Sequence, residues 1–478
     1  MSSAEQWHWP PNYDDTYVPP LDQQHWFPVR ETMAEADREQ LVLGRIQELV
    51  AYAWERSPFY REKWSEAGVH PSHVRSLEDF EKVPVLRKDE LRAEQEAHPP
   101  FGRYVCVPDS EIKHVHGTSG TTGRPTTFGI SGRDWRAIAN AHARVMWSMG
   151  IRPADTLFVG SFFSLYMGSW GALIGAERLG ARVFPFGAGV AGQTQRAVNW
   201  MLQMRPAAFY GTPSYALRIA EVAEESGIDC RDFGLRTMLF GGEPGASVPS
   251  IRQRLETVYG ARVLDTGSMA EVTPWMNLSS SAASEGMLCW QDIVYTEVVD
   301  PRSLSRVPYG SEGTPVYTTL ERTSQPMIRL LSNDLTRWEA PSSACGRTYP
   351  VLPRGIYGRI DDMFTVRGEN IHPSAIDDVV MAAPGYGGEH RIIISRTGSM
   401  DELTVEVEHD EFIATGGDAA VAGWSARLGD RLREVLGVSA QVCPVTRGSF
   451  ERTDLKSMRV VDQRELSADA VAAASMRG

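Results

Sequence analysis

The chain has 478 residues, long enough for one large domain and a smaller second one. Its 61 acidic and 48 basic side chains give a formal charge of −13, which argues against nucleic acid as a partner. Its hydrophobic residues (42%) include no run of 18, so we expect a soluble globular protein and no membrane partner.

The first residues lack the basic and apolar regions of a secretion signal. The five cysteines are scattered and odd in number, which favours free thiols and a cytoplasmic location. Residues 1–30 are rich in Trp, Tyr and Pro and predict an irregular arm packed on the body. Apolar residues at helical spacing predict a helix over 31–67.

Strands and helices alternate from about 133 to 320. We expect Gly180 to close one helix and Thr212 to cap the start of another. The expected helices span 133–149, 171–180 and 212–227, and the expected strands span 156–163, 181–187, 235–243, 261–268, 292–300 and 314–320. This alternation predicts an α/β domain with mostly parallel sheets.

The last part has a different pattern. Two strands (391–396 and 402–410) precede a helix at about 418–436, which Gly437 closes, and a strand at 440–445. We therefore expect a large N-terminal α/β domain, residues 1–357, and a small α+β C-terminal domain, residues 358–478.

The most distinctive segment is HGTSGTTGRPTTFGIS, residues 116–131. Glycines in such a loop let backbone amides converge on an anion, and its hydroxyl groups and Arg124 add donors. The spacing differs from that of the nucleoside-triphosphatase P-loop. A phosphate-binding loop is the functional interpretation, and a flexible polar loop is the alternative.

The segment TSGTTGRPT resembles the signature loop of the adenylate-forming superfamily of acyl-CoA synthetases, luciferases and adenylation domains. Five more motifs resemble that superfamily in the same order: GGEPGA (241–246), DTGSMAEV (265–272), IRLLSNDLTR (328–337), GRIDDMFTVRGENIHPSAID (358–377) and DLKSMRVVD (454–462). Two further segments are similar to those of phenylacetate-CoA ligases: GAERLGARVFPFGAG and RGENIHP. The resemblance covers about residues 40–465.

The resemblance implies an ATP-dependent ligase that uses Mg²⁺, forms an acyl-adenylate with release of pyrophosphate, and passes the acyl group to coenzyme A with release of AMP. It assigns catalysis to Lys456, Glu271 and Thr121, with Glu271 as the Mg²⁺ ligand. Asp361 would be the hinge of a mobile C-terminal domain, and Lys456 would neutralise charge during adenylation. A homodimer is also implied.

The same resemblance assigns nucleotide and CoA contacts. These are Thr118, Ser119, Gly120, Thr122 and Gly123 at the phosphates, Gly242, Glu243, Pro244, Asp265, Thr266 and Gly267 around adenine, Asp334 at the ribose, Arg359 at the nucleotide or the thioester-stage ligand, and Arg367 and Gly368 at CoA.

Two features depart from the family pattern. Gly267 stands where relatives carry an adenine-stacking aromatic residue, and Ala270 replaces the Ser or Thr before Glu271. Of the positions that hold a structural zinc in some relatives, only Cys345 carries a thiol, so we expect no zinc.

Bulky aromatic residues in 161–175 and 210–215 suit a flat apolar acid. The expected acid-binding residues are Phe163, Tyr166, Trp170, Tyr210 and Met269, and we expect Thr273 and Trp275 to close the far end of the pocket with Met269. The leading hypothesis is an aryl- or arylacetic acid:CoA ligase with a small aromatic carboxylic acid as its partner. In one alternative, the enzyme passes the acyl group to an amine or a carrier protein instead of CoA. In another, the protein is a non-catalytic relative that binds a nucleotide.

Overall fold

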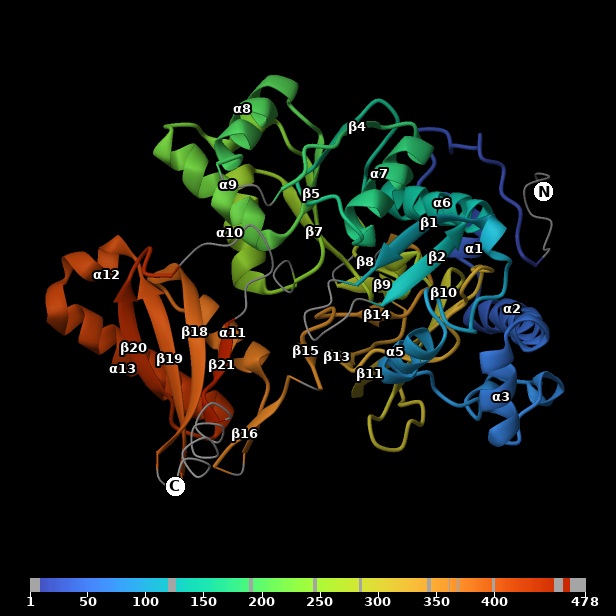
Figure 1. Ribbon diagram of the computed structural model, residues 1–478. Helices are drawn as coiled ribbons and strands as arrows, with labels where there is room; N and C mark the ends of the chain where they lie inside the picture. Colours follow the sequence, from blue (N-terminus) through green and yellow to red (C-terminus); the bar gives the residue numbers. More distant parts are fainter. Residues whose placement is uncertain are drawn as a thin grey trace. The chain divides into compact units, whose positions relative to one another are not determined.

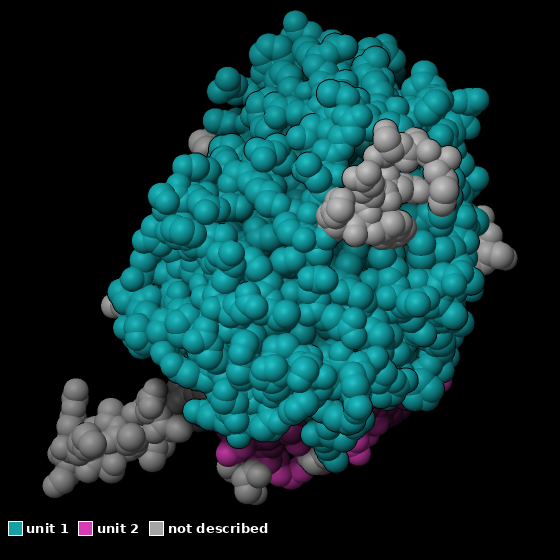
Figure 2. Space-filling model, turned by 90° about the vertical axis from the view of Figure 1, so that its right-hand side faces the viewer, with its two compact units in different colours: residues 1–247, 254–356 teal, residues 248–253, 357–478 magenta. Residues whose placement is uncertain are grey.

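The structure is a computed structural model, and it divides into two compact units (Figures 1 and 2). The first unit comprises residues 1–247 and 254–356, and the second comprises residues 248–253 and 357–478. The limits expected from the sequence did not place 248–253 in the smaller part. The described residues are 9–118, 126–188, 192–243, 247–282, 286–341, 345–360, 362–367, 369–397, 400–450 and 459–464.

The largest sheet of the first unit has the strand order β14-β9-β8-β7-β6-β5-β3-β4. Its strands are β3 (Thr156–Val159), β4 (Arg182–Phe184), β5 (Ala208–Gly211), β6 (Thr237–Phe240), β7 (Arg262–Gly267), β8 (Leu278–Ser279), β9 (Met287–Cys289) and β14 (Val351–Leu352). The five strands from β4 to β7 are parallel, and the remaining pairs are antiparallel. The α/β class is confirmed.

Helices cover both faces of the parallel strands. Figure 1 shows α6 (Gly132–Ser148) and α7 (Met167–Leu179) on one side, and α8 (Thr194–Met204) and α9 (Pro213–Glu225) on the other. Strands β3, β5 and β6 are buried along their whole length, which explains their short, continuously apolar sequences. The helix α10 (Pro249–Tyr259) precedes β7.

Two predicted helix ends are confirmed. Gly180 follows α7 with φ of 87°, the left-handed conformation in which glycine has no steric penalty. The Thr212 side chain accepts a hydrogen bond from the Tyr215 backbone N–H at the start of α9.

A second sheet in the first unit is antiparallel, so "mostly parallel" applies only to the larger sheet. It contains β10 (Val294–Val299), β11 (Glu312–Thr319), β12 (Leu330–Leu331) and β13 (Asp334–Arg337). The strands expected at 292–300 and 314–320 are β10 and β11, whose buried apolar runs gave no sign of strand direction.

The helix expected over 31–67 is two helices, α2 (Glu35–Arg56) and α3 (Pro58–Glu66). The break has a local cause, because Pro58 disfavours helical geometry at Ser57, whose side chain caps α3. The other N-terminal elements are α1 (Pro28–Glu31), α4 (Leu77–Phe80), α5 (Lys88–Ala97), β1 (Ile112–Gly117) and β2 (Thr127–Ser131).

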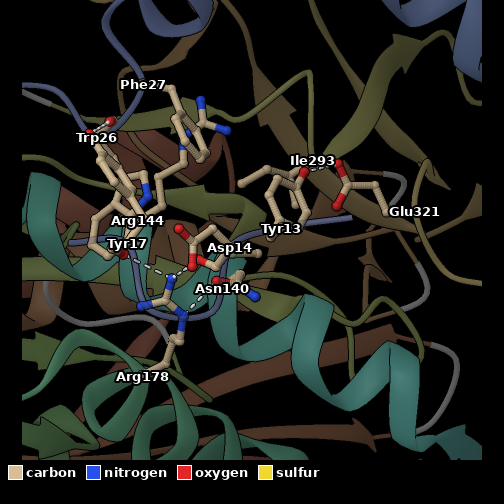
Figure 3. Close-up of a pocket in the computed structure, with 11 residues that line it drawn as sticks. Tyr13, Asp14, Tyr17, Trp26, Phe27, Asn140, Arg144, Arg178, Ile293 and Glu321 are labelled. Carbon is tan, nitrogen blue, oxygen red and sulfur yellow. Dashed lines mark hydrogen bonds between the residues drawn. The ribbon is translucent and has the colours of Figure 1, made fainter. Parts of the chain in front are cut away.

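The N-terminal arm packs on the body, as expected. The Trp9 indole N–H donates to the Leu320 carbonyl at 2.8 Å, and Trp26 is buried. Figure 3 shows a small pocket where arm side chains face Asn140 and Arg144 of α6.

Beneath the arm lies a buried charge cluster. The Arg144 guanidinium lies 2.8 Å from both the Glu31 and the Asp292 carboxylates. Although burial alone raises carboxyl pKa values, Arg144 holds the pKa of both Glu31 and Asp292 at about 2. These paired charges anchor the arm and give the pocket a structural role.

The second unit is an α+β module, as expected. Its main sheet has the order β20-β19-β18-β21, and Trp424, Leu428 and Leu432 of α13 lie in its core. Its elements are β15 (Gly358–Arg359), β16 (Phe364–Val366), β17 (Glu369–Ile371), α11 (Pro373–Met381), β18 (Tyr386–Thr397), β19 (Met400–His409), α12 (Glu411–Thr415), α13 (Gly417–Leu436), β20 (Gln441–Thr446) and β21 (Val460–Asp462). Within the described ranges, no helix is long and apolar enough to span a membrane.

Candidate active site

The candidate site lies at the carboxyl edge of the parallel strands. Because β3, β5, β6 and β7 run in the same direction, the residues that follow them lie along one edge of the sheet. In open α/β sheets, ligands bind at this edge. The edge carries four segments that the sequence singled out: 161–166, 210–212, 241–243 and 267–271.

The stem of the predicted phosphate loop is a two-stranded antiparallel ribbon of β1 and β2. Above it, the Thr118 N–H donates to the Thr126 carbonyl, and the Thr126 N–H donates to Thr118 Oγ1, both at 3.0 Å. The Gly117 N–H donates to the Leu165 carbonyl at 2.9 Å, which places the stem beside the segment after β3. Ser119, Gly120, Thr121, Thr122 and Gly123 lie outside the described residues.

Glu271 is a buried carboxylate whose two oxygens have different surroundings. The residue is 1% exposed, and its Oε2 has no hydrogen-bond partner in the described part of the chain. Its Oε1 lies 3.5 Å from the ammonium of Lys88, the first residue of α5. Arg322 donates to the Glu271 carbonyl at 2.9 Å and lies 5.9 Å from the Phe128 ring of β2, so Glu271 is near the loop stem.

These residues fit a magnesium ion that arrives with a nucleotide. The described ranges contain no group of three or more His, Cys, Asp or Glu side chains able to hold a metal. A nucleotide-bound Mg²⁺ needs only one or two protein carboxylates, since phosphates and water complete its shell. Glu271 offers for this purpose its Oε2, which no described residue contacts by a hydrogen bond.

Lys88 was not among the residues predicted from the sequence. It stands in the segment LRKDEL with no recognisable motif, and only the folded chain brings it to Glu271. The absence of zinc, predicted because Cys345 is the only thiol at the expected positions, stays a prediction.

The residues expected around adenine and ribose lie on adjacent turns. Gly242 has φ of 90°, a conformation that favours glycine at this turn. The Glu243 carboxylate accepts a hydrogen bond from the Ser214 N–H at 2.8 Å, so it caps α9. Thr266 Oγ1 donates to the Phe240 carbonyl at 2.9 Å, tying β7 to β6.

The remaining members of this group are also placed. Asp265 is buried in β7, and Gly267 ends that strand, where an added Cβ would meet only Met287 Cε at 3.6 Å. Asp334 begins β13, and its N–H donates to Ser332 Oγ at 3.0 Å. Pro244 lies outside the described residues.

The expected acid-binding side chains fall into two groups. Tyr210 and Met269 are buried, and the Tyr210 ring lies 5.5 Å from the Trp275 ring. Burial raises the pKa of both Tyr166 and Tyr210, and their hydroxyl groups interact with each other. Phe163 and Trp170 are half-buried and lie edge to face at 5.3 Å.

The residues predicted in the second unit are partly described. Arg359 lies 3.9 Å from Asp362, and its carbonyl is 3.2 Å from His372 Nδ1. Arg367 has φ of 52° and donates from Nε to the Asp401 carbonyl at 3.1 Å. Asp361, Gly368 and Lys456 lie outside the described residues.

Comparisons with known proteins agree with this arrangement. The profile of the AMP-binding enzyme family matches residues 66–317, and that of the AMP-binding enzyme C-terminal domain matches residues 368–464. The fold and the candidate site therefore define an adenylate-forming enzyme.

The particular branch follows from individual relatives. The chain is 32% identical to the phenylacetate-coenzyme A ligase of Thermus thermophilus over 452 residues, covering 92% of this chain and 99% of that protein. It is 58% identical to a crystal structure of 2-hydroxyisobutyryl-CoA ligase in the postadenylation state with 2-HIB-AMP, with coverage of 98% and 99% and a TM-score of 0.94. The chain is 59% identical to a structure of that ligase with 2-HIB-AMP and CoA. This match covers 99% of both chains and has a TM-score of 0.75. The chain belongs to the phenylacetate-CoA ligase-like branch of the adenylate-forming superfamily.

Proposed function

We propose that this chain is an AMP-forming acid–CoA ligase. The observation that carries the proposal is the buried carboxylate of Glu271, near the stem of the phosphate loop. Its Oε1 lies beside Lys88, and its Oε2 has no hydrogen-bond partner within the described ranges. A buried carboxylate oxygen without a partner is costly, so a cationic ligand at Oε2 in the working state best explains the arrangement. The same acidic residue is the one that the family motif assigns to Mg²⁺.

The reaction consists of two transfers. The carboxylate of the acid attacks the α-phosphorus of ATP, and pyrophosphate leaves. The thiol of CoA then attacks the acyl carbon of the adenylate, which gives the thioester, AMP and a proton. No nucleophilic side chain is required, so the protein contributes positioning and electrostatic stabilisation.

The residues divide these tasks. Glu271 would hold Mg²⁺, which neutralises negative charge on the phosphates when it is bound. The loop that begins at Thr118 would offer backbone amides to the phosphates, and Asp334 would accept from the ribose hydroxyls. Lys456 would supply a positive charge at the developing bond during adenylation.

Two classes of acid are candidates. The relatives at about one-third identity are named for phenylacetate, and the aromatic residues Phe163 and Trp170 suit an aryl or arylacetic acid. The relative at 58% identity is named for 2-hydroxyisobutyrate, a short branched hydroxy acid. Because its identity is much higher and extends over nearly the whole chain, we favour the short hydroxy acid.

Pyrophosphate release tests the proposal directly. It is measured with phenylacetate, benzoate, 2-hydroxyisobutyrate and 3-hydroxyisobutyrate, with and without CoA. We expect turnover that depends on CoA with at least one acid, and an acyl-CoA product by mass spectrometry. If pyrophosphate release does not depend on CoA and the acyl group passes to an amine or a carrier protein, that molecule is the acceptor instead of CoA. If no acid causes pyrophosphate release, the chain is not a ligase of this kind.

A further inference from the structure

The indole N–H of Trp275 is a buried donor at the carboxyl edge of the sheet. Trp275 is 6% exposed, and its Nε1 has no hydrogen-bond partner in the described part of the chain. A buried donor without an acceptor is unfavourable, and tryptophan usually finds a partner for this group when it is buried. A ligand is therefore a candidate for the missing acceptor.

The indole spans the region where the acid is expected. At one end, a Cβ added to Gly241, in the turn after β6, would lie 3.8 Å from Trp275 Cζ3. At the other end, a Cβ added to Gly171 of α7 would lie 2.3 Å from Trp275 Nε1. The ring thus reaches from the predicted adenine segment to α7, and only glycine at 171 allows the indole nitrogen to come so close to that helix.

The neighbouring side chain of His142 does not serve as the acceptor. The His142 ring lies 5.2 Å from the Trp275 ring, and burial lowers the His142 pKa to about 4, so this imidazole is neutral at physiological pH. Its Nδ1 lies 3.0 Å from the Gly171 carbonyl, which can only accept, so Nδ1 carries the proton. Its Nε2 accepts from the Met276 N–H at 3.5 Å, which uses its remaining lone pair.

We propose that Trp275 is a specificity-determining residue whose indole N–H donates a hydrogen bond to a hydroxyl oxygen on the short acyl chain of the substrate. This inference rests on the proposed function and narrows its acid to one that carries a hydroxyl group close to the carboxylate. An acid with a methyl group in that place leaves the donor buried and unpaired, so we expect it to react roughly 10- to 100-fold less well.

The test uses two acids of nearly the same shape. In 2-hydroxy-2-methylpropanoate one substituent is a hydroxyl, and in 2,2-dimethylpropanoate it is a methyl group. We expect wild type to favour the hydroxy acid at least about 10-fold in kcat/KM for ATP–pyrophosphate exchange. Trp275→Phe, which keeps an aromatic ring but lacks the N–H, should abolish this preference by lowering kcat/KM for the hydroxy acid only.

A matched variant controls for the loss of an indole. Trp338 is also buried and donates from its Nε1 to the Pro308 carbonyl at 3.1 Å, so its acceptor is already in the protein. Trp338→Phe should leave the ratio between the two acids unchanged. A ratio that changes with Trp338→Phe and not with Trp275→Phe would overturn the assignment.

Wild type alone provides a second measurement in case Trp275→Phe does not fold. The acid 2-amino-2-methylpropanoate carries an ammonium group, which donates and cannot accept. We expect it to react at least about 10-fold less well than the hydroxy acid. Equal or faster reaction of the ammonium acid would contradict a protein donor at this position.

The outcomes separate this inference from the proposed function. If several acids form adenylates but Trp275→Phe keeps the wild-type preference, the ligase stands and the role of Trp275 is wrong. If phenylacetate reacts faster than both short acids, the hydroxy-acid class is wrong. If no acid forms an adenylate, both proposals fail.

Discussion

The ammonium of Lys88 lies 3.5 Å from Glu271 Oε1, although the two residues are far apart in the sequence. The Glu271 side chain is 2% exposed and the Lys88 side chain 25%, so a partly exposed cation covers a buried carboxylate. Without a metal ion, this contact compensates part of the cost of burying the Glu271 charge. From this contact we predict the effect of one substitution at Glu271 and one at Lys88.

Glu271→Gln should lower ATP–pyrophosphate exchange by about 100-fold or more, because the amide cannot replace a carboxylate as a ligand of Mg²⁺. The melting temperature should not fall, since the substitution removes a buried charge, and Glu271 Oε2 has no hydrogen-bond partner among the described residues. Exchange is measured across a magnesium titration, with the exposed Glu62→Gln as a control. Full activity at ordinary magnesium would contradict the assigned role.

Lys88→Met should lower the melting temperature of the free protein, because it leaves the Glu271 carboxylate buried and without its cation. Addition of magnesium and ATP should restore much of the loss, since a bound cation takes over that compensation. Thermal melts with and without both ligands provide the measurement. Lys82→Met is the control, because Lys82 is 72% exposed and pairs with Asp79 on the surface.

Lys456→Ala should separate the two half-reactions. We expect adenylate formation to fall by about 100-fold or more, because a positive charge at the developing bond is lost. Thioester formation from chemically prepared acyl-adenylate and CoA should change far less, since the proposed role of Lys456 is confined to the first step. Equal losses in both half-reactions would contradict this division.

The buried cluster of Glu31, Asp292 and Arg144 predicts how stability depends on pH. The pKa of each carboxyl group is about 2 in the folded protein and about 4 when unfolded, so the unfolded state binds protons first as the pH falls. The stabilisation is therefore complete above about pH 5 and is lost progressively between about pH 5 and 2. Urea denaturation at several pH values measures it.

Arg144→Met tests the cause of that dependence. It should cost about 3 kcal/mol at pH 7, because Glu31 and Asp292 lose the buried cation that they share, while Arg347 and Arg30 remain beside them. The difference from wild type should shrink toward about pH 2. Arg236→Met is a suitable control, since its pair with Asp155 is on the surface and should contribute less than about 1 kcal/mol. A difference that does not depend on pH would contradict the electrostatic explanation.

Local signals predicted the elements of the fold well. Gly180 and Thr212 mark helix ends by properties of their own, namely freedom at positive φ and a side-chain acceptor, so their roles were readable without the fold. The break at Ser57 and Pro58 was missed because the apolar spacing continues across it. The alternation of strands and helices predicted the class α/β. A buried strand has the same apolar pattern whether it pairs parallel or antiparallel, so the sequence did not predict the antiparallel second sheet.

Some residues of the candidate site belong to recognisable motifs, and others reach the site only when the chain folds. Sequence motifs predicted roles for Glu271, the phosphate loop and Asp334, because the chemistry of phosphate and metal binding restricts residue type and order over short segments. Lys88 carries no such signal, since a lysine at the start of a helix is an ordinary residue. The sequence placed Trp275 at the far end of the acid pocket, but nothing in it indicated an indole N–H without an acceptor among the described residues. Their importance depends on which charge or acceptor lies nearby, and that is decided when distant segments meet at the carboxyl edge of the sheet.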